Sequence, residues 1–356
     1  MRRVSRLLVT MVVALLGVCA FLGYRGEFAL VEPQFVAQAQ APVLVPMDPV
    51  VVADQVEAAL VNIDVETAGF GGGAAGSGIV LTEDGQILTS HHVIKGADEL
   101  RVTDIANGLV YEATVLGYDS GADIALLSLA GASGLPVARL GTSADLRITQ
   151  DVLAIGDAGG DGGEPTAVTG PITDLNATIV AMNSADLTRK ALNGMVEVAA
   201  PVMGGQSGGA LADATGAVIG VITAASGEAS RTEGNPPNGY AVPIDTAMRI
   251  VTQIRSGTPT DTVHIGPTAT LGVQVIDGRP AGAQVSWAFY GQPAREAGIT
   301  IGDVITAIDG VSITTAKALS AAINLRKPAD PVRLDVTSPD GVTRTVEAVL
   351  AQGTPT

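Results

Sequence analysis

The sequence predicts a mainly β protein in which paired β-barrels or a β-sandwich precede a small α+β domain. Three observations predict this architecture. Short apolar runs separated by turn signals form two series, 44 glycines accompany only 3% aromatic residues, and mixed strand and helix patterns follow residue 256. At 356 residues the chain is too long for one comfortable core. We therefore expect about two domains and a targeting segment.

The first 41 residues have the pattern of an export signal. Arg2, Arg3 and Arg6 precede an uncharged apolar run over residues 7–24. A basic patch before such a run indicates a signal peptide, and the run is also about long enough to anchor the chain in a membrane. We expect residues 1–41 to act as a signal peptide or signal anchor, which makes the protein secreted or associated with the cell envelope.

Two series of predicted strands fill residues 42–255. A helical pattern over residues 245–255 ends the second series, and residues 256–262 are predicted to form a linker. The C-terminal domain then spans residues 263–353. The predicted strands of the two series lie at residues 60–65, 78–82, 86–88, 100–103, 111–117, 124–129, 151–155, 177–182, 194–198, 209–211 and 217–222.

Composition excludes several functions. The net charge of −16 disfavours nucleic acid as a partner, because an acidic surface repels phosphates. The only cysteine, Cys19, lies in the N-terminal apolar run, so the folded body has no disulfide and no cysteine nucleophile. The chain has only three histidines, which makes a metal centre built from several histidines improbable. We therefore expect no metal and no cofactor.

A glycine-rich loop around Ser207 is the strongest chemical signal. Residues 204–211 read GGQSGGAL. Flanking glycines let the backbone approach a substrate closely. The N–H groups of Gly205 and Ser207 can then point at one oxygen and stabilise the negative charge of a tetrahedral intermediate.

A serine nucleophile needs a general base and a group that orients the base. His92 follows a predicted strand, and Asp123 stands directly before an apolar strand, where it can be buried. His91 is the less favoured base. Asp119 is the competing acid, but its Gly and Ser neighbours are typical of a solvated turn. His264 falls at the linker, and we expect no catalytic role for it.

The order His92, Asp123, Ser207 is that of chymotrypsin-type proteases. The flanking residues resemble the HtrA/DegP family of trypsin-like serine proteases, and are most similar to its secreted, mycobacterial PepA-type branch. The resemblance covers residues 50–353. It rests on residues 76–80 (GSGIV), 89–94 (TSHHVI), 123–127 (DIALL), 168–170 (VTG), 205–211 (GQSGGAL) and 240–244 (YAVPI).

The resemblance implies a chymotrypsin-like double β-barrel and an ATP-independent endopeptidase that degrades unfolded or damaged extracytoplasmic proteins. It also implies homotrimers. The primary specificity pocket would be formed by Pro201, Thr223 and Ala224. Since residues 198–207 include no acid, an ionised Lys or Arg side chain would lack a partner there. We expect cleavage after small or medium apolar residues.

Two residues depart from the family pattern. Ser90 stands where the family usually has Asn, and Gln206 stands where it usually has Asn or Asp. Gln206 lies between the two predicted oxyanion donors, where a longer side chain can bias the loop toward an inactive arrangement. The alternative function is therefore a latent protease that acts as a chaperone or peptide-binding protein.

The C-terminal domain resembles a PDZ domain. Residues 293–299 (PAREAGI) lead into residues 302–310 (GDVITAIDG), which resemble the most recognisable PDZ sequence. Residues 269–273 (ATLGV) resemble the carboxylate-binding loop of PDZ domains. The resemblance implies that the N–H groups of Leu271, Gly272 and Val273 would bind a peptide C-terminus. The peptide would add as a strand to the sheet edge.

Overall fold

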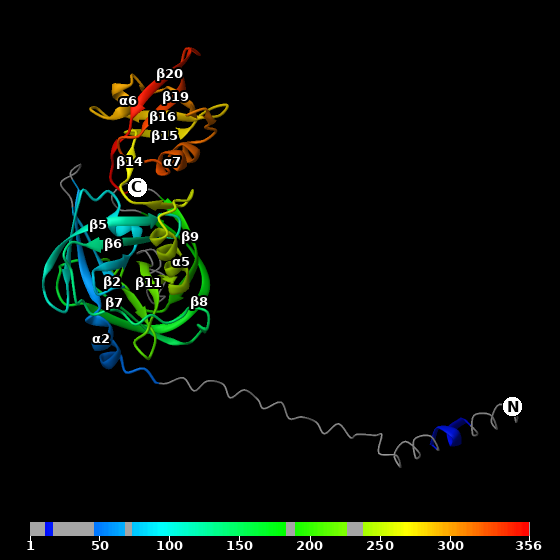
Figure 1. Cartoon of the computed structure of the whole chain (residues 1–356). Helices are drawn as coiled ribbons and strands as arrows, with labels where there is room; N and C mark the ends of the chain where they lie inside the picture. Colours follow the sequence, from blue (N-terminus) through cyan, green and yellow to red (C-terminus); the bar gives the residue numbers. More distant parts are fainter. Residues whose placement is uncertain (1–10, 17–45, 68–72, 183–188, 226–237, 356) are drawn as a thin grey trace. The chain divides into compact units, whose positions relative to one another are not determined.

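The computed structural model describes residues 11–16, 46–67, 73–182, 189–225 and 238–355 (Figure 1). The chain divides into two units, Met1–Leu44 and Val45–Thr356. In the first unit residues 11–16 are helical, and the rest of the expected signal segment up to residue 41 lies outside the described residues. Within the described part of the chain, no helix is both long enough and apolar enough to span a bilayer.

Six strands close the first barrel. Its order is β5-β4-β1-β2-β3-β6, and β6 pairs back with β5. Alternate side chains of β1 point inward, as a period of two requires, so Val61, Ile63 and Val65 are buried in the barrel core. The strands are β1 (Leu60–Glu66), β2 (Gly73–Val80), β3 (Gln86–Thr89), β4 (Glu99–Asp104), β5 (Val110–Asp119) and β6 (Ile124–Leu129).

A second closed barrel follows in the order β10-β11-β12-β9-β8-β7. Figure 1 shows the long β8–β9 pair in green at its side. Val152, Val196 and Ile222 are among the buried side chains of its core. The strands are β7 (Asp151–Gly156), β8 (Thr166–Met182), β9 (Arg189–Val198), β10 (Ala210–Ala212), β11 (Val218–Ala225) and β12 (Gly239–Pro243).

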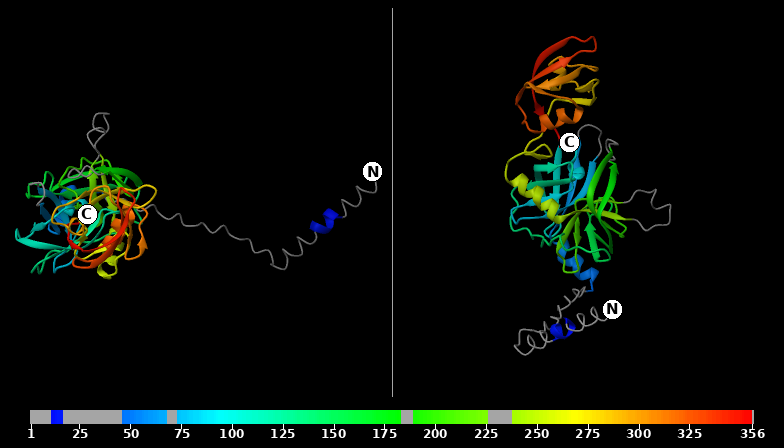
Figure 2. Two further views of the ribbon diagram at one scale, coloured as in Figure 1. Left: turned by 90° about the horizontal axis from the view of Figure 1, so that it is seen from above. Right: turned by 90° about the vertical axis from the view of Figure 1, so that its right-hand side faces the viewer.

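One apolar cluster joins the two barrels. It packs Leu126 of the first barrel and Leu153 of the second with Val251 of α5 (Ile244–Arg255). The helix α5 runs beside the barrels in Figure 2. A second helix, α2 (Pro49–Glu57), also contributes to this cluster, and its N-cap Asp48 accepts a bond from the Val50 N–H at 3.1 Å. The shared core holds the barrels together, so loops from both can form one site.

The C-terminal domain has a sheet of order β15-β16-β17-β19-β20. Ile305 and Leu334 of this sheet and Leu319 of α7 lie in one buried core. The elements are β14 (Ala269–Thr270), β15 (Val273–Asp277), β16 (Ala283–Ala288), α6 (Pro293–Glu296), β17 (Val304–Ile308), β18 (Val311–Ser312), α7 (Ala316–Asn324), β19 (Pro331–Thr337), β20 (Thr343–Val349) and β21 (Ala351–Gln352). This α+β arrangement after two barrels confirms the predicted fold class.

One short strand adds to the first barrel from an unexpected part of the sequence. β13 (Val263–Ile265) pairs with residues 117–119 of β5. From the sequence, these three residues were expected at the start of the C-terminal domain. A strand of three residues carries too little alternation to reveal its partner, so only the pairing assigns it to the barrel sheet.

Candidate active site

Strand pairing brings His92 and Asp123 together. β3 pairs with β6 so that Thr89 lies opposite Ala125. The short helix α3 (His91–Ile94) begins just after β3, and Asp123 directly precedes β6. Asp123 has a φ of 59°, and its carbonyl accepts a bond from the His91 N–H at 3.2 Å. The end of one strand and the start of its neighbour therefore position the two side chains.

The Asp123 carboxylate binds His92 through both of its oxygens. Oδ2 lies 2.8 Å from His92 Nδ1, and Oδ1 accepts a bond from the His92 backbone N–H at 2.9 Å. The His92 side chain is 37% exposed, whereas that of Asp123 is 7% exposed. Nδ1 is thus engaged on the buried side of the ring, which leaves Nε2 for a second partner.

The contact between His92 and Asp123 shifts the pKa of both groups. Burial opposes protonation of His92, but the Asp123 charge and hydrogen bond outweigh it and raise the pKa of the imidazole. Burial also disfavours the Asp123 carboxylate. The attraction of His92 and hydrogen bonds from His92 and Thr223 overcome that effect and lower the pKa of Asp123. Asp123 is therefore the ionised, fixed partner of a more basic imidazole.

Ser207 enters the site from the second barrel. It lies in the loop between β9 and β10, and its carbonyl accepts a bond from the Ser77 N–H at 2.8 Å. The Ser207 hydroxyl donates to the carbonyl of Thr223 at 3.4 Å. Among the described residues no hydrogen bond joins this hydroxyl to His92.

Thr223 connects the nucleophile loop to the acid. Its hydroxyl donates to Asp123 Oδ2, while its carbonyl accepts from Ser207. The side chain is 3% exposed. From the sequence, Thr223 was expected only in the specificity pocket. Its bond to Asp123 spans 100 residues, and no local motif signals such a contact.

The oxyanion loop has its carbonyls turned into the protein. The Gly204 carbonyl accepts from the Gly159 N–H at 2.8 Å, and the Gly205 carbonyl accepts from Ser77 Oγ at 2.9 Å. Within the described ranges, the N–H groups of Gly205 and Ser207 donate to no acceptor. Both predicted donors are therefore available to a substrate oxygen.

Gln206 is buried away from these donors. Its side chain is 0% exposed, its Oε1 accepts from the Met203 N–H at 2.8 Å, and its Nε2 donates to the Thr166 carbonyl at 2.7 Å. A longer side chain at this position was expected to be able to favour an inactive loop. In the structure the amide instead ties the loop to β8.

The other candidate residues lie apart from this arrangement. The His91 ring is buried and packs on Tyr118, with ring centroids 4.7 Å apart, and His264 packs on the same ring at 5.0 Å. Asp119 accepts from the Ala122 N–H at 3.1 Å and is 8% exposed. The expectation of a solvated turn is therefore wrong for Asp119 itself, because it is the buried last residue of β5 and pairs with Ile124 and Val263, whereas Gly121 in the turn that follows is exposed.

The predicted specificity residues flank the Ser207 loop. Pro201 is exposed at the start of the loop, and Ala224 lies on β11 opposite Tyr240 of β12. Glu197, the acid that precedes this segment, accepts bonds from the Tyr240 hydroxyl at 3.0 Å and from the Asn238 side chain at 2.6 Å. Its carboxylate is thus already engaged by protein donors.

The predicted carboxylate loop of the PDZ domain is a tight turn before β15. Gly272 has a φ of 73°, and a Cβ there would lie 2.2 Å from the Cβ of Gln292. The Leu271 carbonyl accepts from the Ala294 N–H at 2.9 Å, which fixes the loop against α6. The Gly272 N–H lies 3.1 Å from the Thr270 hydroxyl. A bound carboxylate would compete with this hydroxyl for that donor.

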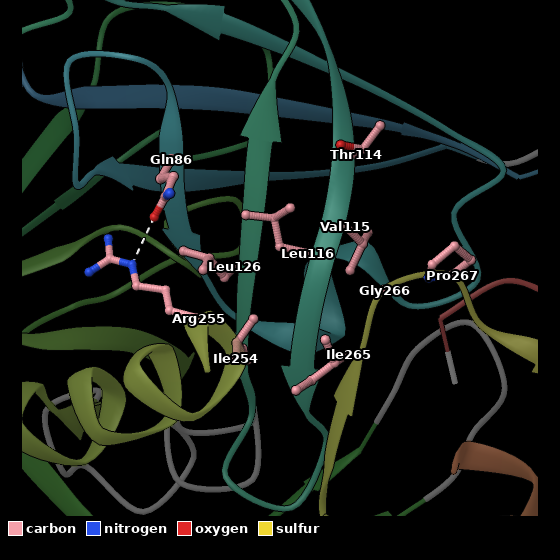
Figure 3. Close-up of a pocket in the computed structure, with 10 residues that line it drawn as sticks. All are labelled: Gln86, Thr114, Val115, Leu116, Leu126, Ile254, Arg255, Ile265, Gly266 and Pro267. Atoms are coloured by element: carbon pink, nitrogen blue, oxygen red, sulfur yellow. Dashed lines mark hydrogen bonds between the residues drawn. The ribbon is translucent and has the colours of Figure 1, made fainter. Parts of the chain in front are cut away.

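A pocket of about 570 Å³ lies elsewhere on the protease domain (Figure 3). Apolar side chains of β5, β6, α5 and β13 form much of its wall, and Arg255 Nε donates to Gln86 Oε1 at 2.9 Å beside it. None of the candidate catalytic residues lines this pocket. It is therefore separate from the site around Ser207.

Two family profiles match the chain in this domain order. The family profile of the trypsin-like peptidase domain matches residues 76–221, and that of the PDZ domain matches residues 269–350. A crystal structure of the serine endoprotease from Yersinia pestis aligns with a TM-score of 0.48 and 24% identity, over 86% of this chain and 99% of that one.

Curated relatives carry protease names. Serine protease PepD of Mycobacterium tuberculosis is 33% identical over 78% of this chain and 61% of its own length. A Halomonas elongata protein named "Probable periplasmic serine endoprotease DegP-like" is 31% identical over 73% of this chain and 53% of its own. The chain thus spans about 53% to 61% of the length of these relatives. The protein is a homologue of the HtrA-type serine proteases, with a trypsin-like peptidase domain followed by a PDZ domain.

Proposed function

We propose that the protein is an exported serine endopeptidase with Ser207 as nucleophile, His92 as general base and Asp123 as the orienting acid. The observation that carries this proposal is the continuous set of contacts from Asp123 to His92 and, through Thr223, to Ser207. A ring held at Nδ1 by a buried carboxylate presents Nε2 as a proton acceptor. The Ser207 hydroxyl reaches it by turning away from the Thr223 carbonyl, since hydrogen bonds in such sites often shorten only when substrate binds.

The reaction is acyl transfer to serine and then to water. Ser207 Oγ attacks the peptide carbonyl while His92 takes its proton, and the N–H groups of Gly205 and Ser207 bind the resulting oxyanion. His92 then returns the proton to the leaving amine. A water molecule, deprotonated by His92, releases the acyl group as a carboxylate. Asp123 stays ionised and stabilises the imidazolium in both steps.

Unfolded or damaged extracytoplasmic proteins are the proposed substrates. The name of the Halomonas relative includes the word periplasmic, and residues 1–41 have an export pattern. We also propose homotrimers, which sedimentation analysis of the purified protein tests. A monomer at micromolar concentration would refute that part.

The pocket beside Pro201 is proposed to accept small or medium apolar side chains. Glu197 is engaged by Tyr240 and Asn238 rather than free to pair with a substrate cation. A charged substrate side chain would then be buried without a counter-ion. Cleavage of a peptide library measures this preference, and strong selection of Lys or Arg before the cut would refute it.

The PDZ loop is proposed to bind peptide C-termini beside β15. Trp287, the only tryptophan of the chain, lies on the neighbouring strand β16 and is 47% exposed. Its fluorescence therefore reports on peptide binding at this sheet. Free-carboxylate peptides should bind and their C-terminal amides should not; equal binding of both would contradict the proposal.

Casein degradation tests the protease function directly. Wild-type protein should release peptides, and Ser207→Ala should release none while keeping the same melting temperature. If both proteins are inert but still bind C-terminal peptides, the protein is instead a peptide-binding or chaperone protein with a latent protease fold.

A further inference from the structure

Ser77 of the first barrel binds the oxyanion loop of the second barrel at two points. Its hydroxyl donates to the Gly205 carbonyl at 2.9 Å, and its backbone N–H donates to the Ser207 carbonyl at 2.8 Å. The same hydroxyl accepts from the Asp157 N–H at 2.8 Å. Ser77 is 1% exposed. One buried residue thus holds the carbonyls on both sides of Gln206.

The Gly205 carbonyl belongs to the peptide between the two oxyanion donors. The preceding peptide carries the Gly205 N–H, and the following peptide carries the Ser207 N–H. Because each peptide is planar, rotation of the middle unit changes the torsions that aim both neighbours. Gly205 has a φ of 90° and no Cβ to restrict such a rotation. The N–H of this peptide, that of Gln206, donates to the Met203 carbonyl at a long 3.3 Å, and the Ser77 hydroxyl adds the shorter bond that fixes its carbonyl end.

The Ser77 hydroxyl fills a site with no spare room. A Cβ added to Gly156 would lie 2.7 Å from Ser77 Oγ, so the surroundings are closely packed. Loss of the hydroxyl would leave the Asp157 N–H and the Gly205 carbonyl without this partner. Unpaired buried groups are costly, so the loop would rearrange to satisfy them.

We propose that Ser77 is a positioning residue that keeps the oxyanion loop in its donating arrangement. It touches neither the substrate nor His92, and it acts through the Gly205 carbonyl. Its hydrogen bonds involve no titrating group, so they hold the loop equally well across the pH range of activity. The inference rests on the proposed protease function and adds a residue from the opposite barrel to it.

Steady-state kinetics with a peptide substrate test the proposal on the full chain. Ser77→Ala should lower kcat about 10- to 100-fold with KM unchanged, which is less than the roughly 100- to 1000-fold loss when a donor itself is removed. A peptide boronic acid that forms a tetrahedral adduct on Ser207 should lose affinity by the same factor. In a Ser207→Ala background, Ser77→Ala should leave the Kd of the uncleaved substrate unchanged.

Ser143→Ala is the matched control. The Ser143 hydroxyl also donates one bond, to Asp245 Oδ2 at 2.9 Å, and accepts one backbone N–H bond, from Asp245 at 3.2 Å. Within the described part of the chain, its hydrogen bonds go to Asp245 and none goes to the Ser207 loop. Its removal should lower the melting temperature without a selective loss of kcat.

Ser77→Cys keeps a donor at the same position, although the thiol is larger and a weaker donor, and its kcat should lie between those of wild type and Ser77→Ala. It carries the test if Ser77→Ala does not fold. A folded Ser77 variant with kcat within twofold of wild type, or a loss matched by Ser143→Ala, overturns the inference. An inert wild-type protein overturns the protease function instead, so the two failures are distinct.

Discussion

Asp123 accepts hydrogen bonds from three groups that come from two barrels. The His92 ring, the His92 backbone N–H and the Thr223 hydroxyl all meet its two carboxylate oxygens. This leaves the carboxylate little freedom and keeps it ionised in a buried site. The proposed role of His92 as general base therefore depends on the Asp123 charge, which holds the His92 ring and raises its pKa.

The raised pKa of His92 predicts the acid limb of the activity profile. His92 must be neutral to accept the serine proton, so kcat/KM should fall as pH drops through a midpoint above the ordinary value of 6.5. Asp123→Asn should remove most activity, by about 10⁴-fold. Hydrolysis rates between pH 5 and pH 9 measure the profile, and a midpoint below the ordinary histidine value would contradict the assignment.

The same pair predicts opposite stability trends. His92 has a raised pKa in the folded state, so its contribution is complete below the unfolded value and is lost as pH rises through the folded one. Asp123 has a lowered folded pKa, so its contribution is present above its unfolded value and is lost as pH falls through the folded one. Urea unfolding of wild type and Asp123→Asn should be measured from below pH 3.8 to pH 9, because the Asp123 trend lies below its ordinary pKa of 3.8, and both trends should disappear together in the variant.

Thr223→Val tests the bond between the barrels. Valine keeps the shape but removes the donor to Asp123, and hydrogen bonds to charged groups contribute about 1.5–3 kcal/mol. We expect the free energy of unfolding to fall by about that amount, as measured in urea. Thr178→Val is the matched control, because its hydroxyl bonds Asn193 Oδ1 at an exposed position. An equal loss in both variants would exclude a special role for Thr223.

At the element scale, the loop between β9 and β10 depends on glycine conformation. A Cβ at Gly205 would lie 2.0 Å from the Asp157 carbonyl oxygen, whereas one at Gly204 would meet nothing within 4 Å. Gly205→Ala should therefore abolish peptide hydrolysis, because the loop must move, and Gly204→Ala should keep it. Assays of the two neighbouring variants under one condition compare them directly. Full activity in Gly205→Ala would show that this loop conformation is not required.

Local patterns predicted most elements but not all of their extents. β6 has the predicted residues and α5 begins only one residue before the predicted 245–255, because the apolar run of β6 and the helical spacing of α5 are clear. β8 begins at Thr166, although only residues 177–182 were predicted, since its first half is largely exposed and its register shifts near Asp174. Exposure and bulges both remove the alternation that marks a strand.

At the scale of the whole molecule, the site joins segments that are far apart in the sequence. His92 and Asp123 were predictable because each adjoins a recognisable strand, and Ser207 because its loop is rich in glycine. The contacts Thr223–Asp123 and Ser77–Gly205 span 100 and 128 residues. Such contacts follow from how the two barrels pack, which no single segment encodes.

Covalent labelling with a serine-directed fluorophosphonate tests most directly whether His92 activates Ser207, because the probe needs both an activated hydroxyl and an oxyanion site. We predict one label per chain, on Ser207, with labelling lost in Ser207→Ala and strongly slowed in His92→Ala. Labelling that is absent from folded wild-type protein, or unchanged in His92→Ala, would contradict it.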